Sequence, residues 1–417
     1  MNRPAEAMPR GSARSTVLDV IRAAGTISRI GIVEITGLTG ATISIVVRRL
    51  IDDGLVIETG KTKSTGGKPR VLLQLNQTAR YAVGVHLDRS SLTYVLTNLG
   101  GGVVARMSRA GVGVEDPPTV VARMASQVQA LIDGVGVARS RVLGLGLVSP
   151  GPLTPLSGMP ITPPSMRHWE DFPLDRALEK AVGLPVVLDN DATAAALGEF
   201  WSGGVGSATT FAAVFMSTGI GAGLIVNGGA YRGLSGNAGE IGHICIDLNG
   251  AECWCGAHGC TETVAGPVAV VAAARADPTI AHEVGFDKKQ GRRRTSIASD
   301  FAAIARVARR DDSAARDLLK TSARYLAIAT RTLVNIMDLD RIVLTGSSLA
   351  VAGSVYLPVI QEELDKPFFA RASHAVTVQL SRSATTAAAI GAAAMVLQSE
   401  LVPLRRGLRL PENSVGF

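Results

Sequence analysis

Residues His243 to Thr263, HICIDLNGAECWCGAHGCTET, hold all 4 cysteines of the chain and decide how the rest of it is interpreted. Thiolate sulfur and imidazole nitrogen together suit a tetrahedral zinc ion. Gly256 and Gly259 let so short a segment turn sharply enough to direct several thiolates to one point. We therefore expect a structural zinc site, with ligands drawn from His243, Cys245, Cys253, Cys255 and Cys260.

Disulfides and buried free thiols are the competing explanations for these cysteines. Disulfides belong mainly to oxidising compartments, and nothing in the sequence marks the chain as secreted. Cysteine is also often a small buried apolar residue, which would suffice for Cys245. The spacing allows four cysteine ligands, or His243 with Cys253, Cys255 and Cys260. If His243 and Cys245 share a strand they point to the same face, so periodicity does not choose between them.

Length and composition predict an α/β protein of two or three domains. The chain has 417 residues, of which 47% are hydrophobic, 4% are aromatic and 46 are glycine. No apolar run is long enough to span a membrane. The first residues, MNRPAEAMPRGSARS, lack the apolar core of a signal peptide. We expect a cytoplasmic protein with no membrane partner.

The positive charge is concentrated at the N-terminal end. The net charge is +7, and residues 1–75 contribute 11 basic and 6 acidic side chains. A small basic head on a nearly neutral body is typical of a nucleic-acid-binding domain joined to a ligand-binding domain.

The pattern of residues 15–76 predicts a winged helix-turn-helix after a disordered tail, 1–14. A helix is expected from about Ser15, a second over Ile27–Thr36, and a third over Ala41–Asp52. A basic, glycine-rich hairpin follows and predicts a wing lying along phosphates. The residues predicted to contact double-stranded DNA are Thr39, Thr42, Ser44, Arg48, Arg49, Lys61, Lys63, Lys68 and Arg70.

Polar residues follow a buried strand at Val186–Leu188. Asp189, Asn190 and Asp191 then precede an alanine-rich helix, and ligand sites of α/β proteins form at such carboxyl edges. The same residues would also serve as an N-cap for the helix. Both roles are compatible.

The motifs Glu240–His243 (EIGH) and Cys253–Glu262 (CWCGAHGCTE) resemble the signature of the ROK family of repressors, open reading frames and sugar kinases. The resemblance extends over roughly residues 15–397. It implies an actin-like (ribonuclease H-like) fold of two α/β lobes behind the winged helix-turn-helix. It also selects four zinc ligands and leaves Cys245 out: His243, Cys253, Cys255 and Cys260.

The resemblance further implies a domain plan. The first lobe would cover residues 79–196 and be completed by a C-terminal helix within 376–397. The second lobe, with the zinc motif, would cover 197–375, and 398–417 would be a loose tail. A sugar or sugar derivative would bind between the lobes to Gly158, Ser165, Asn190, Asp191, Glu240, His243 and Glu262.

The nucleotide half departs from the family's kinases. Where the first phosphate motif, Asp-x-Gly-Gly-Thr, is expected, this chain has His86, Asp88 and Arg89 in place of the acid and the glycines. The segment 217–223 resembles the second phosphate loop and is kept. Close approach of a backbone to phosphate requires glycine, and a carboxylate there repels phosphate. We expect a degenerate ATP site with no catalytic residue.

The resulting hypothesis is a sugar-controlled transcriptional regulator, a repressor, that binds an operator as a homodimer or homotetramer. The alternative is an ATP-dependent sugar kinase with an added DNA-binding head. In such kinases the residue matching Asp191 is the general base for the sugar hydroxyl. A regulator that no longer binds a simple sugar is a third interpretation, based on Ser165 and Thr193.

Overall fold

The structure is a computed structural model that describes residues 13–61, 69–151, 167, 169–170, 172–206, 208–286, 296–367 and 374–401. Side chains are described as far as residue 398, and Lys61 is described only by its backbone. Several sequence predictions lie outside these residues, namely those for Gly158, Ser165, Lys63, Lys68, most of the tail 1–14, and residues 402–417 of the tail. The tail was predicted to begin at residue 398, but residues 398–401 instead continue the last helix, which ends at Leu401.

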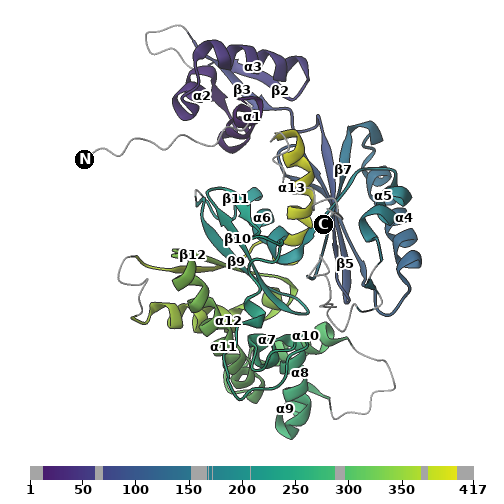
Figure 1. Ribbon diagram of the computed structural model, residues 1–417, viewed down its shortest axis with the longest axis vertical. Helices are drawn as coiled ribbons and strands as arrows, with labels where there is room; N and C mark the ends of the chain where they lie inside the picture. Colours follow the sequence, from purple (N-terminus) through teal and green to yellow (C-terminus); the bar gives the residue numbers. More distant parts are fainter. Residues whose placement is uncertain are drawn as a thin grey trace, which may run out of the picture.

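The N-terminal head is a bundle of three helices against a small antiparallel sheet (Figure 1). Buried apolar side chains at helical spacing, such as Val17, Ile21, Ile43 and Val47, form its core. The sheet order is β1-β3-β2. The elements are α1 (Ala13–Ala24), β1 (Ile27–Ser28), α2 (Arg29–Thr36), α3 (Gly40–Asp52), β2 (Val56–Lys61) and β3 (Val71–Leu75).

One boundary in the head differs from the sequence prediction. A helix was expected to begin at Ile27, but Ile27–Ser28 is a short strand paired with Leu72–Leu73. The Ser28 side chain accepts a hydrogen bond from the Gly31 amide, so Ser28 caps α2 from outside the helix. Strand β1 thus adds a third strand to the β2–β3 hairpin. Its pairing with β3 joins residues far apart in the chain, so no local sequence pattern predicted it.

The body contains two five-stranded sheets with the same topology. In each, the first three strands of the chain are antiparallel neighbours, and the last two add in parallel beside the first. The first sheet has the order β6-β5-β4-β7-β8 and the second β11-β10-β9-β12-β13. The strands are β4 (Tyr81–Leu87), β5 (Ser91–Asn98), β6 (Val103–Ala110), β7 (Val142–Ser149), β8 (Val186–Asn190), β9 (Phe211–Met216), β10 (Ile220–Val226), β11 (Gly229–Tyr231), β12 (Arg341–Thr345) and β13 (Thr377–Leu380).

Helices cover both sheets, and we call each sheet with its helices a lobe. Among the residues that the structure describes, the α-helices that cover the first sheet from outside are α4 (Pro117–Val135) and α5 (Leu174–Val182). The second lobe has α7 (Thr261–Ala265), α8 (Pro267–Ala276), α9 (Pro278–Val284), α10 (Ile297–Val307), α11 (Ala314–Met337) and α12 (Ser347–Asp365). Strand β13 also belongs to the second sheet, so part of the segment 376–397 assigned to the first lobe is instead a strand of the second.

Two helices, α6 (Asp191–Trp201) and α13 (Ala387–Leu401), lie side by side between the sheets. Helix α13 packs on β4 and β7 of the first sheet, as expected for the C-terminal helix, and α6 packs on β10 of the second. The two backbones touch where Gly391 meets Gly198. A Cβ on Gly391 would lie 1.7 Å from the Ala194 carbonyl oxygen, so only glycine fits there.

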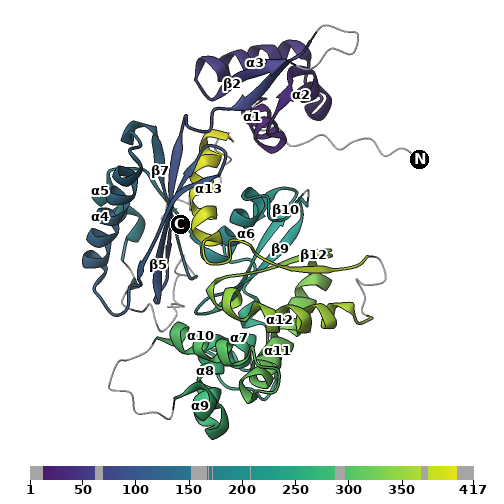
Figure 2. The same ribbon diagram turned by 180° about the vertical axis from the view of Figure 1, so that it is seen from behind.

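The head rests on the ends of this helix pair (Figure 2). Helix α1 contacts α13, and core residues of the head and of the helix pair form one continuous apolar cluster. The Arg22 guanidinium of α1 lies 4.5 Å from the centroid of the Trp201 ring at the end of α6. A cation over an aromatic face is attracted by the ring's negative face. Within the described parts of the chain, no helix is both long and apolar enough to cross a membrane.

The close crossing of α6 and α13 predicts that a glycine-to-alanine substitution at the crossing lowers the free energy of unfolding, whereas the same substitution elsewhere on a helix does not. Gly391→Ala inserts an atom into backbone, so we expect destabilisation of about 2 kcal/mol or more, or failure to fold. Gly134→Ala is the matched control, because it lies on α4 and a Cβ there would meet nothing within 4 Å. Alanine is the better helix former, so the control should be neutral or stabilising. Thermal unfolding followed by circular dichroism measures both, and equal melting temperatures would contradict the packing described.

Candidate functional site

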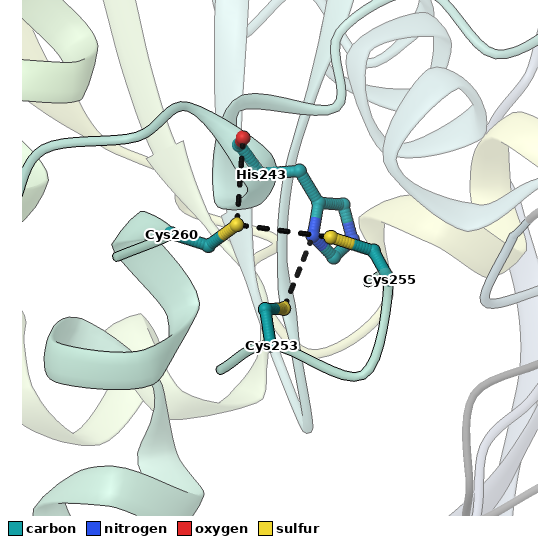
Figure 3. Close-up of side chains that lie close together, drawn as sticks. All are labelled: His243, Cys253, Cys255 and Cys260. Atoms are coloured by element: carbon teal, nitrogen blue, oxygen red, sulfur yellow. Dashed lines mark hydrogen bonds between the residues drawn. The ribbon is translucent and has the colours of Figure 1, made fainter. Parts of the chain in front are cut away.

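The side chains of His243, Cys253, Cys255 and Cys260 converge on one point (Figure 3). Their ligand atoms all lie within 4.8 Å of one another. The Cys255 and Cys260 sulfurs are 3.7 Å apart, and the Cys253 sulfur is 3.6 Å from Nδ1 of His243. Ligands on a tetrahedral zinc ion lie about 3.3–3.8 Å apart, given bonds of about 2.0–2.3 Å. The cluster therefore has the ligand types and the size to hold such an ion.

Tight turns bring these ligands together. His243 ends a short 3₁₀ helix, Ile241–His243, and Cys260 immediately precedes α7. The Cys253 amide donates to the Ala257 carbonyl at 2.7 Å, which closes the turn that carries Cys255. Gly259 has φ +66°, and a Cβ there would lie 1.6 Å from the Asp247 carbonyl oxygen. Cys245 is exposed and stays outside the cluster.

The pKa shifts of the cluster describe its metal-free state. Burial lowers the pKa of His243, although the charge of Glu262 opposes this, so the imidazole is held in the neutral form that binds metals. Burial and the neighbouring thiols raise the pKa of Cys260 to about 12. Without a positive charge at their centre, three crowded thiolates would repel each other, so the protonated thiols are favoured. A bound cation would instead favour the thiolates.

A second polar cluster forms at the N-terminus of α6. Asn190 is buried and caps the helix, its Oδ1 accepting from the Thr193 amide at 3.0 Å, and Asp191 is the first helical residue. Gly151 faces both lobes here, because a Cβ on it would lie 3.0 Å from Nδ2 of Asn190 and 3.3 Å from Oε1 of Glu240. Polar residues of the first lobe thus meet Glu240 of the second.

Glu262 connects this polar cluster with the cysteine cluster. Its carboxylate accepts from the Trp254 indole at 3.1 Å and from the Ile220 amide at 3.0 Å. Trp254 in turn packs edge-on against the His243 ring, with centroids 4.9 Å apart. Folding of the cysteine loop therefore fixes the position of Glu262, so a metal ion would shape the polar cluster from a distance.

The acidic character of the polar cluster has a measurable effect on Glu240. Burial, reinforced by the negative charges of Asp191 and Glu262, raises the pKa of Glu240 to about 7. A partly protonated carboxyl group both donates and accepts hydrogen bonds. Together the groups offer the mixture of donors and acceptors that a polyhydroxylated ligand requires.

Sequence reasoning missed two contacts of this cluster. Nε2 of His86 lies 3.3 Å from Oδ2 of Asp191, and both side chains are buried. Arg232 of the second lobe forms an ion pair with Asp189 of the first, at 2.7 Å. The partners are 105 and 43 residues apart in the chain, so only the sheet topology brings them together.

All but one of the predicted DNA contacts whose side chains the structure describes lie on or beside α3. Thr39 caps this helix by accepting from the Thr42 amide at 3.2 Å. Ser44, Arg48 and Arg49 are exposed along it. Arg70 is exposed just before β3. The side chain of Thr39 is thus partly engaged by the helix terminus, whereas the two α3 arginines extend into solvent.

Comparison with known proteins agrees with this architecture. The chain is 33% identical over 376 residues to a protein named "Putative xylose repressor" from Caldicellulosiruptor sp. (strain Rt8B.4), covering 90% of this chain and 93% of the relative. It is 29% identical over 339 residues to the Escherichia coli DNA-binding transcriptional dual regulator NagC, covering 81% and 80%. A solved ROK family transcriptional regulator, a homologue of E. coli MLC, superposes with a TM-score of 0.71 at 26% identity, covering 93% and 96%.

The repeated sheet topology and the helix pair between the sheets define an actin-like α/β protein, as the sequence predicted. Residues 82–399 match the ROK family. The chain belongs to that family.

The contact between His86 and Asp191 predicts a pH dependence. Burial lowers the pKa of His86, but the hydrogen bond and charge of Asp191, with the charge of Asp88, outweigh it and raise the pKa above its usual value of about 6.5. The stabilising contribution of His86 is therefore fully present below pH 6.5 and is lost as the pH rises through the raised pKa.

Nuclear magnetic resonance titration of the histidine rings, with His86→Gln for assignment, measures this directly. The His86 signal should titrate above pH 6.5. The melting temperature of the wild type should exceed that of His86→Gln most at low pH. A His86 pKa below 6.5 would show that burial dominates and would contradict this prediction.

Proposed function

We propose that this chain is a sugar-responsive transcriptional repressor, whose N-terminal head is a winged helix-turn-helix and whose body senses the sugar. The observation that carries the proposal is the head itself. Three helices and an antiparallel hairpin precede an actin-like body, and the likeness to the Caldicellulosiruptor repressor covers 90% of this chain, which is more than the body alone.

The geometry of α3 supports its role as the recognition helix. It is capped by Thr39, has one apolar face buried in the head, and exposes Ser44, Arg48 and Arg49 on the other. A helix with exposed arginines and short hydroxyl side chains suits the major groove of DNA. The hairpin β2–β3 would lie along the phosphate backbone, and a homodimer or homotetramer would place two heads on an inverted repeat.

The polar cluster between the lobes supports the sensing role. Asn190, Asp191, Glu240 and Glu262 come from both lobes, so a ligand bound among them favours one relative position of the lobes. Such a ligand changes DNA affinity only if it binds the two states with different affinity. Relatives named "Putative xylose repressor" and "N-acetylglucosamine repressor" make these two sugars the first to test.

We further propose that His243, Cys253, Cys255 and Cys260 hold a structural zinc ion. The three sulfurs and one nitrogen complete a tetrahedral set, which leaves no position for substrate. Bound zinc would add rigidity to the loop that positions Glu262 and Trp254. It would therefore act on sugar binding through position rather than chemistry.

The proposal includes no kinase activity. At the end of β4 the chain places His86 and Asp88, and the carboxylate is unsuited to approach a nucleotide phosphate. Asp191 then holds a sugar hydroxyl without removing its proton. Release of ADP by the purified chain with any hexose, abolished by Asp191→Asn, would reverse this part of the proposal.

Metal analysis of purified variants tests the zinc site. The wild type should contain one zinc ion per chain, and Cys260→Ser should lose most of it and melt at a lower temperature. Cys245→Ser is the matched control, since this exposed cysteine of the same loop lies outside the cluster. Equal zinc loss in both variants would show that the ligand set is wrong.

Sequencing of genomic fragments captured by the purified protein, with and without sugars, tests the function. We expect a few enriched sites that share an inverted repeat, and one sugar that releases them. Retention of all fragments alike, weakened evenly by salt, would leave only non-specific binding. Specific sites that no sugar releases would remove the sensing half of the proposal.

Substitution of Arg48 tests the role of α3. Arg48→Ala should weaken binding to captured sites by about 1–3 kcal/mol if the side chain reads a base. Arg106→Ala, an exposed arginine on β6 of the body, is the matched control and should leave DNA affinity unchanged. Fluorescence anisotropy with a captured site measures both, and equal losses would point to a general charge effect.

A further inference from the structure

Asp88 is a fully buried carboxylate at the end of β4. Its backbone is fixed within the first lobe, where its amide donates to the Ser91 carbonyl at 3.1 Å and its carbonyl accepts from the Val112 amide at 3.3 Å. A buried carboxylate is costly unless strong donors compensate it. The source of those donors therefore shows what the residue does.

The donors come from the other lobe. The Ser217 hydroxyl donates to Oδ2 of Asp88 at 2.6 Å, and the Thr218 hydroxyl donates to Oδ1 at 3.2 Å. Both hydroxyls lie in the turn between β9 and β10 of the second sheet. A length of 2.6 Å is typical of a hydroxyl bonded to a charged carboxylate, a class about twice as strong as neutral hydrogen bonds.

The turn that supplies these donors is itself anchored in the second lobe. The Ser348 hydroxyl donates to the Ser217 carbonyl at 2.7 Å, and the hydroxyls of Ser217 and Ser347 lie 2.8 Å apart. Ser347 and Ser348 begin α12, a helix of 19 residues. Asp88 is thus connected through Ser217 to a long helix of the second lobe.

We propose that Asp88 is a latch that holds the two lobes together. One carboxylate, rigid in the first lobe, accepts hydrogen bonds from two hydroxyls of the second lobe, in a turn that the first residues of α12 anchor. The position resembles that of a bound anion, with the chain supplying the anion itself. Closure of the lobes at this edge therefore needs no nucleotide, and the polar cluster at the N-terminus of α6 remains the proposed site for a small molecule.

His86 connects the latch with the polar cluster at the N-terminus of α6. His86 lies on β4, two residues before Asp88. Its Nε2 lies 3.3 Å from Oδ2 of Asp191, and its ring packs edge-on against Phe215 of β9. A ligand that displaces His86 from Asp191 would therefore disturb the strand end that carries the latch. This extension rests on the proposed function, whereas the latch itself does not.

Hydrogen exchange followed by mass spectrometry, on the full-length zinc-loaded chain without ligand, tests the latch. Asp88→Ala removes the acceptor from the first lobe, and Ser217→Ala with Thr218→Val removes both donors from the second. Each should accelerate exchange about tenfold or more on both sides, in residues 86–91 and in residues 215–220. Combining all three substitutions should add little, because each alone already breaks the same contact.

Ser322→Ala is the matched control. This buried hydroxyl donates to the Ala265 carbonyl and contacts the Tyr356 hydroxyl, all within the second lobe, so neither latch segment should change. Acceleration confined to the mutated side would overturn the latch, as would fully additive effects in the combined variant. Neither result bears on DNA or sugar binding, so failure of the latch and failure of the proposed function are separable.

Discussion

The close crossing of α6 and α13 is the constraint on which the rest of the structure depends. Gly391 and Gly198 let the two backbones touch, and each helix packs on a different sheet. The pair therefore joins the lobes and sets where they meet. One end of α6 carries Asn190 and Asp191, and the other end carries Trp201 beneath Arg22 of the head. A change in the relative position of the lobes would therefore act on the head through the contacts that α6 and α13 make with α1.

Several acidic side chains lie where the two lobes meet, and their negative charges need compensation. Asp88, Asp191, Glu240 and Glu262 all lie near the junction, and burial keeps water from screening them. The chain compensates them with hydroxyl donors, with a raised pKa at Glu240, and with His86, whose raised pKa reflects its acidic neighbours. A polyhydroxylated ligand, as proposed above, would offer further donors and so would relieve the same repulsion.

Local patterns in the sequence predicted much of this architecture. Helical spacing of apolar residues predicted the head helices. The density of cysteines predicted a cluster of ligand side chains, and the family resemblance selected His243 with three of the cysteines, which the structure brings together. The strand Ile27–Ser28 and the strand β13 were missed because they exist only through pairing with distant strands. The contacts of Asp88 with Ser217 and of His86 with Asp191 were missed for the same reason, since each spans more than 100 residues.

The proposed function requires sugar and operator to bind one molecule with coupled free energies. Isothermal titration calorimetry with the releasing sugar, on the free protein and on the protein saturated with operator, tests it most directly. Linkage requires the sugar to bind more weakly to the operator complex, by the same factor by which the sugar weakens operator binding. Equal sugar affinities in the two titrations would contradict the account.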